Sequence, residues 1–139
     1  MTDQTQEAFT VMVKHLRKQG RRSTVEPVLG DGSPACMYRN NEGLSCAVGC
    51  LIADANYSSD LEGKYVNADC VEDALADSGW TNVNTHLLGE MQRTHDKLSP
   101  LDWETKFTAI AERFKLDLPE PEPKWIRLYE VGLDEFGGR

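Results

Sequence analysis

The sequence lacks a long apolar run and several motifs that carry chemistry. No stretch approaches the ~18 residues of a membrane-spanning helix, and the first residues, Met1 to Glu7, do not have the basic-then-apolar pattern of an export signal. The phosphate-binding G-x-x-x-x-G-K-[S/T] loop, the dinucleotide-binding G-x-G-x-x-G turn and the G-x-S-x-G nucleophile elbow are also missing. These absences predict a cytoplasmic protein that is not embedded in a membrane, and they argue against those two kinds of nucleotide site.

Paired C-x2-C knuckles, which structural zinc domains use, are missing as well. The four cysteines follow the spacing Cys36-x9-Cys46-x3-Cys50-x19-Cys70. Without an export signal they are expected to be reduced thiols. Small buried thiols explain the pattern best, so we predict no metal and no cofactor. Metal binding by Cys36, Cys46 and Cys50 stays open as an alternative.

The histidines do not form an H-E-x-x-H metal site either. His86 and Glu90 are four residues apart and His95 follows, so a metal would need a further ligand from elsewhere in the chain. Nothing local places a histidine beside a cysteine as a catalytic base. We therefore predict that the protein is not an enzyme, with a metal- or thiol-dependent enzyme as an alternative.

Positive charge is in short supply: 23 acidic residues outnumber 15 basic ones, for a net charge of −8. Such a field repels phosphate backbones and anionic lipid surfaces, so neither nucleic acid nor a membrane is an expected partner. Mimicry of nucleic acid by dense rows of acids is disfavoured because cations interrupt each acidic stretch. One basic patch is expected at the end of the first helix, where Lys14, Arg17, Lys18, Arg21 and Arg22 cluster.

The chain does have the size and composition of one globular domain. It contains 139 residues, 40% of them hydrophobic and 27% charged. Helical apolar spacing predicts helices over 4–19, 69–79 and 83–98, and Ser99-Pro100 begins another. An Asp69/Glu72 capping box is expected at the second of these. Turn residues at 30–34 and 40–43 enclose a predicted short strand, Ala35 to Arg39.

The apolar run Leu44 to Ile52 (LSCAVGCLI) fits either a strand or a buried helix. Helix is favoured, with Ser45 as its N-cap. The following segment, Asp54 to Val66, is expected to be a loop anchored by Tyr57, Leu61 and Tyr65. The predicted fold class is mainly α with a small β-hairpin (α+β), in a compact domain of about five helices plus a C-terminal arm.

Two parts of the chain are distinguished. Residues 1–118 should form the helical domain, with the hairpin near 24–43. Residues 119–139 begin with alternating prolines that favour an extended strap, and continue as an apolar arm that includes Trp125 and Tyr129. Such an arm should pack on the body or on a second copy of the chain, so a homo-oligomer is a possible expectation.

Polar residues converge on the apolar run from both sides. Tyr38 and Arg39 precede it, and Tyr57, Asp60 and Glu62 follow it. If the run is buried, these side chains lie near its two ends and form a candidate ligand- or partner-binding site, which the apolar arm extends through Trp125 and Tyr129. The alternative is that Arg39 pairs with Glu62 or Asp60 and closes the loop.

This middle segment resembles a family of small proteins encoded by tailed bacteriophages and related prophages. The resemblance rests on Cys36, Tyr38 and Arg39, on the run from Gly43 to Asp54 (GLSCAVGCLIAD), and on Tyr57 and Leu61-Glu62-Gly63. It covers about the first half of the chain. Family members often have proline where this chain has Ala53, which affects only how the expected helix ends. The resemblance implies a phage source and the cytoplasm of a bacterial host.

In that setting, we expect an accessory protein that binds and inhibits a host or anti-phage defence protein. The first alternative is a small-molecule module that sequesters a nucleotide signal, because arginine and tyrosine suit phosphate and base recognition. Both expectations rest on binding rather than on catalysis.

Overall fold

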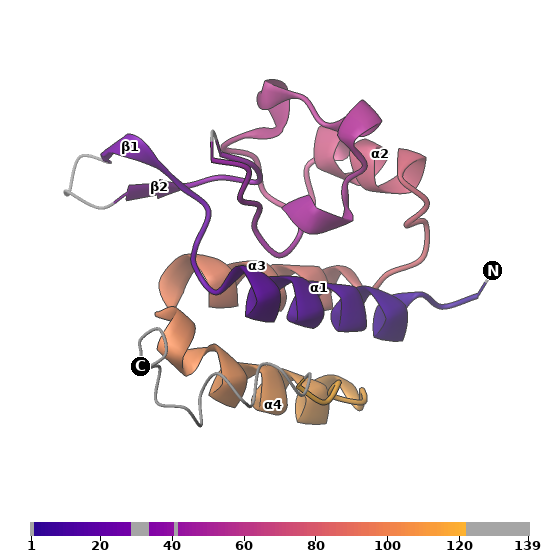
Figure 1. Ribbon diagram of the computed structural model, residues 1–139. Helices are drawn as coiled ribbons and strands as arrows, with labels where there is room; N and C mark the ends of the chain where they lie inside the picture. The colour runs from indigo at the N-terminus through magenta and orange to yellow at the C-terminus, as the bar shows by residue number, and fades with distance from the viewer. Residues whose placement is uncertain (1, 29–33, 41, 122–139) are drawn as a thin grey trace.

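The computed structural model describes residues 2–28, 34–40 and 42–121 (Figure 1). Four α-helices lie within these ranges: α1 (Thr5–Gln19), α2 (Asp69–Asp77), α3 (Thr85–Lys97) and α4 (Trp103–Phe114). Short 3-10 turns are η1 (Gly49–Leu51), η2 (Asp54–Asn56), η3 (Ser59–Leu61) and η4 (Pro100–Asp102). None of the described helices combines the length and the apolar character needed to cross a membrane.

The fold is mainly helical, so the predicted α+β class is wrong. Two short segments, β1 (Thr24–Val28) and β2 (Pro34–Cys36), pair antiparallel and project from the helices (Figure 1). Because this ribbon adds no sheet layer to the body, it does not define a separate β component. Within the described residues there are four α-helices rather than the expected five or so, since the segment 44–52 does not form an α-helix.

The helices form layers around one core. α1 and α3 contact each other, α4 packs on α3, and η1 packs on α1. Figure 1 shows α4 on one side of the α1–α3 layer, with α2 and the turns η1 to η3 on the other side. The largest fully buried side chains include Phe9, Met12, Leu16, Leu87, Met91 and Phe107. The core therefore lies between the middle layer and both of its neighbours.

The predicted helices are present where apolar spacing is clear. α1 ends at Gly20, which takes a left-handed φ of 70° and donates its N–H to Leu16. The Oγ atom of Ser99 accepts a hydrogen bond from the Leu101 N–H, and Pro100 opens η4, which leads into α4. The capping box predicted at Asp69 is wrong. Ala68 occupies the N-cap position without a side-chain cap, so Asp69 lies inside the first turn of α2.

The apolar run 44–52 is not the α-helix that its sequence favours. Ser45 forms a β-bridge with Arg39 instead of an N-cap, and the Cys46 N–H donates to the Tyr38 carbonyl at 3.1 Å. Only η1 within the run is helical. The physical reason is a close crossing: a Cβ atom on Gly49 would lie 2.2 Å from the Tyr38 carbonyl oxygen. The run wraps against the preceding segment and buries its side chains there.

The chain after α4 turns back onto α1. The side-chain amide of Gln6 exchanges two hydrogen bonds with the Asp117 backbone, at 2.8 and 2.9 Å. The Arg17 side chain, only 6% exposed, forms a bidentate ion pair with Glu104 and donates to the Pro119 carbonyl at 2.8 Å. The first part of the expected strap, up to Pro119, therefore packs on the helical body.

Candidate functional site

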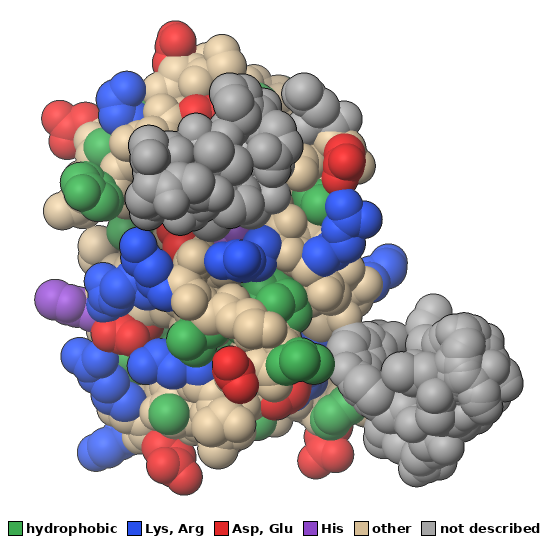
Figure 2. Space-filling view, turned by 90° about the vertical axis from the view of Figure 1, so that its left-hand side faces the viewer, with side chains coloured by type: hydrophobic (Ala, Val, Ile, Leu, Met, Phe, Trp, Pro, Cys, Tyr) green, Lys and Arg blue, Asp and Glu red, His purple; other side chains and the backbone are tan. Residues whose placement is uncertain are grey.

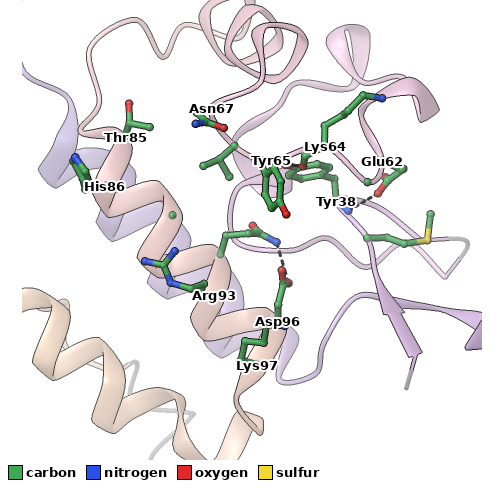
Figure 3. Close-up of a pocket in the computed structure, with 15 residues that line it drawn as sticks. Tyr38, Glu62, Lys64, Tyr65, Asn67, Thr85, His86, Arg93, Asp96 and Lys97 are labelled. Atoms are coloured by element: carbon green, nitrogen blue, oxygen red, sulfur yellow. Dashed lines mark hydrogen bonds between the residues drawn. The ribbon is translucent and has the colours of Figure 1, made fainter. Parts of the chain in front are cut away.

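An open groove runs between α3 and the segment 62–67 (Figure 3). We call it the α3 groove, and its volume is about 710 Å³. The α3 side contributes residues from Thr85 to Lys97, and the opposite wall consists of residues 62–67 with Met37 and Tyr38 behind them. Such a volume lies within the ordinary range of ligand sites in proteins.

The Glu62 carboxylate organises the wall of this groove. One of its oxygens accepts the Tyr38 backbone N–H at 2.8 Å. The other accepts the Arg39 backbone N–H at 3.1 Å and the Tyr57 hydroxyl at 2.6 Å. Four of the residues expected to converge, Tyr38, Arg39, Tyr57 and Glu62, therefore meet. These residues contact one another directly. The Glu62 carboxylate accepts three hydrogen bonds within the cluster, so it needs no added ligand as a hydrogen-bond partner.

The Arg39 guanidinium does not pair with Glu62 or Asp60, so the alternative in which such an ion pair closes the loop is wrong. It donates to Asp54 at 2.7 Å and to the Ile52 carbonyl, and it lies 4.9 Å from the centre of the Tyr57 ring. The reason is geometric, because the backbone N–H groups of Tyr38 and Arg39 already occupy the Glu62 oxygens. Asp60 is exposed on η3, outside this cluster.

Both phenols in the cluster are held in their protonated form. Burial, and then the hydrogen bond to Glu62, raise the pKa of Tyr57 to about 12. Burial also raises the pKa of Tyr38, whose hydroxyl donates to the Lys64 carbonyl at 2.6 Å. A protonated phenol can donate at neutral pH. Tyr38 therefore ties the wall segment to the core, and the cluster serves as the scaffold of the groove.

Tyr65 was expected to anchor its loop in the core, and this prediction is wrong. Its side chain is 83% exposed, and Figure 3 shows its ring standing between the wall and α3. The loop is held instead by Leu61, which is buried, and by Tyr38. The backbone N–H groups of Tyr65, Val66 and Asn67 have no partner among the described residues.

The α3 side of the groove carries exposed cationic and imidazole groups. His86, Arg93 and Lys97 are all exposed along the helix, and a Cβ atom on Gly89 would lie 3.8 Å from the Arg93 guanidinium, which is an ordinary contact distance. The Lys64 side chain points away from α3 in Figure 3 and donates to the Asp60 carbonyl at 3.3 Å. Figure 2 shows Lys and Arg side chains gathered across the end of the molecule where α1 and α3 finish.

Glu90 is the focus of a charge network beside the groove. It contacts Arg93 and Arg113 at 2.8 Å each, and Lys106 at 3.7 Å. The hydrogen bond from Arg93, followed by that from Arg113, lowers the pKa of Glu90. One carboxylate thus faces three cations, so this network has an excess of positive charge in a chain whose net charge is −8.

His95 is a structural residue rather than a base facing solvent. It is fully buried and stacks on Trp103. Its Nε2 atom accepts the Ser23 backbone N–H at 2.9 Å, so its Nδ1 atom carries the proton that is donated to Asp96 at 2.7 Å. Both ring nitrogens are therefore engaged. The Asp96 carboxylate also accepts from the Gln92 side chain at 3.0 Å.

The two thiols in the described part of the run, Cys46 and Cys50, are buried and partly buried, respectively. Cys46 is fully buried, and burial raises the pKa of its thiol. Burial likewise raises the pKa of Cys50 to about 12. Both thiols stay protonated at neutral pH, whereas a nucleophile or a metal ligand has to be a thiolate. Within the ranges that the structure describes, no group of three or more His, Cys, Asp or Glu residues is placed to hold a metal ion.

Sequence reasoning missed the groove itself. Tyr65, Arg93 and Lys97 belong to segments about 30 residues apart that only the fold brings together. A partial signal was present, because Arg93 and Lys97 are four residues apart on the polar side of a clear amphipathic helix. The side chains of Cys36, Trp125 and Tyr129 lie outside what the structure describes.

Comparison with family models, with curated proteins and with solved structures finds no match for this chain. The resemblance to a phage family therefore stays a prediction.

Proposed function

We propose that the protein is a non-catalytic phage accessory protein that binds a host or defence protein in the host cytoplasm and inhibits it. The observation that carries this proposal is the α3 groove, an open channel with the exposed Tyr65 ring along one wall. Tyrosine is enriched among the residues that dominate binding energy at protein interfaces. A large aromatic side chain that is 83% exposed beside a groove is better explained by a partner than by folding.

The rigidity of the wall supports this role. The wall segment is held by the Glu62 carboxylate and by the Tyr38 hydroxyl, through hydrogen bonds of 2.6 to 3.1 Å. A site that is already ordered loses less conformational entropy when its partner binds. The polar cluster therefore contributes to binding through preorganisation.

The alternatives have less support from the contacts. A nucleotide pocket built from Tyr38, Arg39, Tyr57 and Glu62 would need free polar groups, yet these side chains engage one another. A thiol enzyme would need a thiolate, and the pKa of Cys46 is raised by burial. Each alternative would have to use parts of the chain other than these clusters.

Site-specific photo-crosslinking tests the proposal. Tyr65 is replaced by benzoylphenylalanine, which is also aromatic, and the protein is irradiated in a host lysate. We expect one host protein to be captured in a defined crosslink, and its activity to fall when the uncrosslinked wild-type protein is added to the purified target.

Leu101 offers a matched control, because its side chain is 92% exposed and does not line the groove. Benzoylphenylalanine at position 101 should not capture the same protein. The proposal fails if position 65 captures nothing above background, or if both positions capture the same set of proteins.

A further inference from the structure

We propose that the α3 groove recognises an acidic, extended peptide segment of its partner. This inference rests on the proposed function and names the chemistry of the segment that binds. It follows from three features of the groove: its charge, its length and its unpaired backbone donors.

The charge of the groove is opposite in sign to that of the chain as a whole. The lining has three cations, Lys64, Arg93 and Lys97, against two acids, Glu62 and Asp96, so its formal charge is +1, whereas that of the chain is −8. Arg93 uses one N–H on Glu90, and a guanidinium has five such donors. The Lys97 ammonium has no partner in the described part of the chain. The cations thus remain available to carboxylates from outside.

The length of the groove along α3 favours a peptide. From His86 to Lys97, both of which line the groove, the helix advances eleven residues, or about 16 Å at 1.5 Å per residue. An extended peptide of about five residues spans the same distance. A single phosphate group would engage only the end of the groove that carries Arg93 and Lys97. The groove is also open along its length, whereas small-molecule sites usually enclose most of their ligand.

A nucleic acid is a poorer occupant than an acidic peptide. A polymer of phosphates would extend beyond the groove and meet a protein whose net charge is −8, which opposes its approach. A short acidic segment meets only the local cations. Its charge complementarity with this face would increase the rate of association.

The wall offers hydrogen-bond donors for such a segment. The N–H groups of Tyr65, Val66 and Asn67 have no partner within the described ranges. Carboxylate and carbonyl oxygens of a peptide can accept from these groups in place of water. Tyr65 adds an aromatic face for any apolar side chain between the acids.

Fluorescence anisotropy with a fluorescein-labelled hexaglutamate peptide tests the inference. We expect saturable binding to the full-length protein at about 25 mM salt, weakened by an increase to about 250 mM because salt screens exposed charges. The double variant R93Q/K97Q should bind about tenfold more weakly, since it removes two exposed charge contacts. Hexalysine should not bind this groove.

The matched control is K14Q/K18Q. These lysines are also four residues apart and exposed on a helix, α1, and they do not line the groove. The control removes the same charge, so it should leave peptide affinity within about twofold of the wild type. Circular dichroism of both variants establishes that each is folded.

Three results would overturn the inference: no binding of hexaglutamate, equal loss of affinity in both double variants, or stronger competition by ATP than by unlabelled peptide. The last result would identify a phosphate ligand instead. The photo-crosslink at position 65 separates this inference from the proposed function. If R93Q/K97Q still captures the host protein in full, the groove binds a partner by other chemistry and only the acidic-peptide inference fails.

Discussion

The substitution Gly49→Ala tests the crossing on which the scaffold depends. The new Cβ atom would lie 2.2 Å from the Tyr38 carbonyl oxygen and 2.9 Å from its carbon, so the backbones must separate by about 0.8 Å to reach an acceptable 3.0 Å. Overpacking of this kind costs about 1–3 kcal/mol. The same carbonyl accepts the Cys46 N–H, and the loss of that buried hydrogen bond costs about 1–3 kcal/mol more. We expect a total near 4 kcal/mol.

Urea denaturation followed by tryptophan fluorescence measures this loss. Trp80 reports on the crossing, because its indole N–H donates to the Leu51 carbonyl at 3.0 Å. With an m-value near 2 kcal/mol/M, the unfolding midpoint should fall by about 2 M. Gly89→Ala is the control: its Cβ would lie 3.8 Å from the nearest atom, so the helix should gain about 0.5–1 kcal/mol. Equal midpoints for Gly49→Ala and the wild type would refute the close crossing.

Three further predictions concern other parts of the chain. Glu104→Gln leaves the buried Arg17 without its ion pair, which should lower the free energy of unfolding by about 2 kcal/mol. The Tm should therefore fall by about 8 °C, and an unchanged Tm would contradict this. Burial lowers the pKa of His15 from 6.5, so the unfolded chain takes up the proton first and stability should fall as pH drops below about 6.5. Between pH 7.5 and 5.5 the urea midpoint should fall less in His15→Gln than in the wild type. An equal fall in both proteins would contradict the role given to His15. Iodoacetamide should label the exposed Cys70 more than about tenfold faster than the buried Cys46, as peptide mapping can show; similar rates would mean that Cys46 is accessible.

The helices could be predicted because their signals are local. α1 and α3 each place apolar residues on one face, and their observed ends lie within two residues of the predicted ones. Ser99 and Pro100 marked the start of the last helical segment for the same reason. Local spacing and capping chemistry are properties of a short window of sequence, so they can be read without the fold.

The run 44–52 could not be predicted in the same way. Its apolar residues suit a helix, but the crossing of Gly49 over Tyr38 forces a 3-10 turn and a bridge instead. Ser45 shows the same effect: its backbone N–H donates to the Gln19 side chain, and its carbonyl lies 2.9 Å from the His15 ring. These partners belong to α1, so tertiary contacts outweighed the local preference.

The candidate site was predicted only in part. The convergence of Tyr38, Arg39, Tyr57 and Glu62 followed from their places at the two ends of a buried run. Their role did not follow, because backbone N–H groups satisfy the Glu62 carboxylate and no sequence pattern reports where backbone donors point. Tyr65, whose side chain is 83% exposed, likewise has no sequence pattern that marks it as a groove residue.

Amide hydrogen exchange gives the most direct test of the claim that the α3 groove is where the protein binds its partner. In the free protein the N–H groups of Tyr65, Val66 and Asn67 should exchange rapidly, since they have no partner among the described residues. With the captured host protein bound, we predict slow exchange at these positions and little change at the exposed end of α4. Unaltered exchange across 62–67 in a saturated complex would contradict the account.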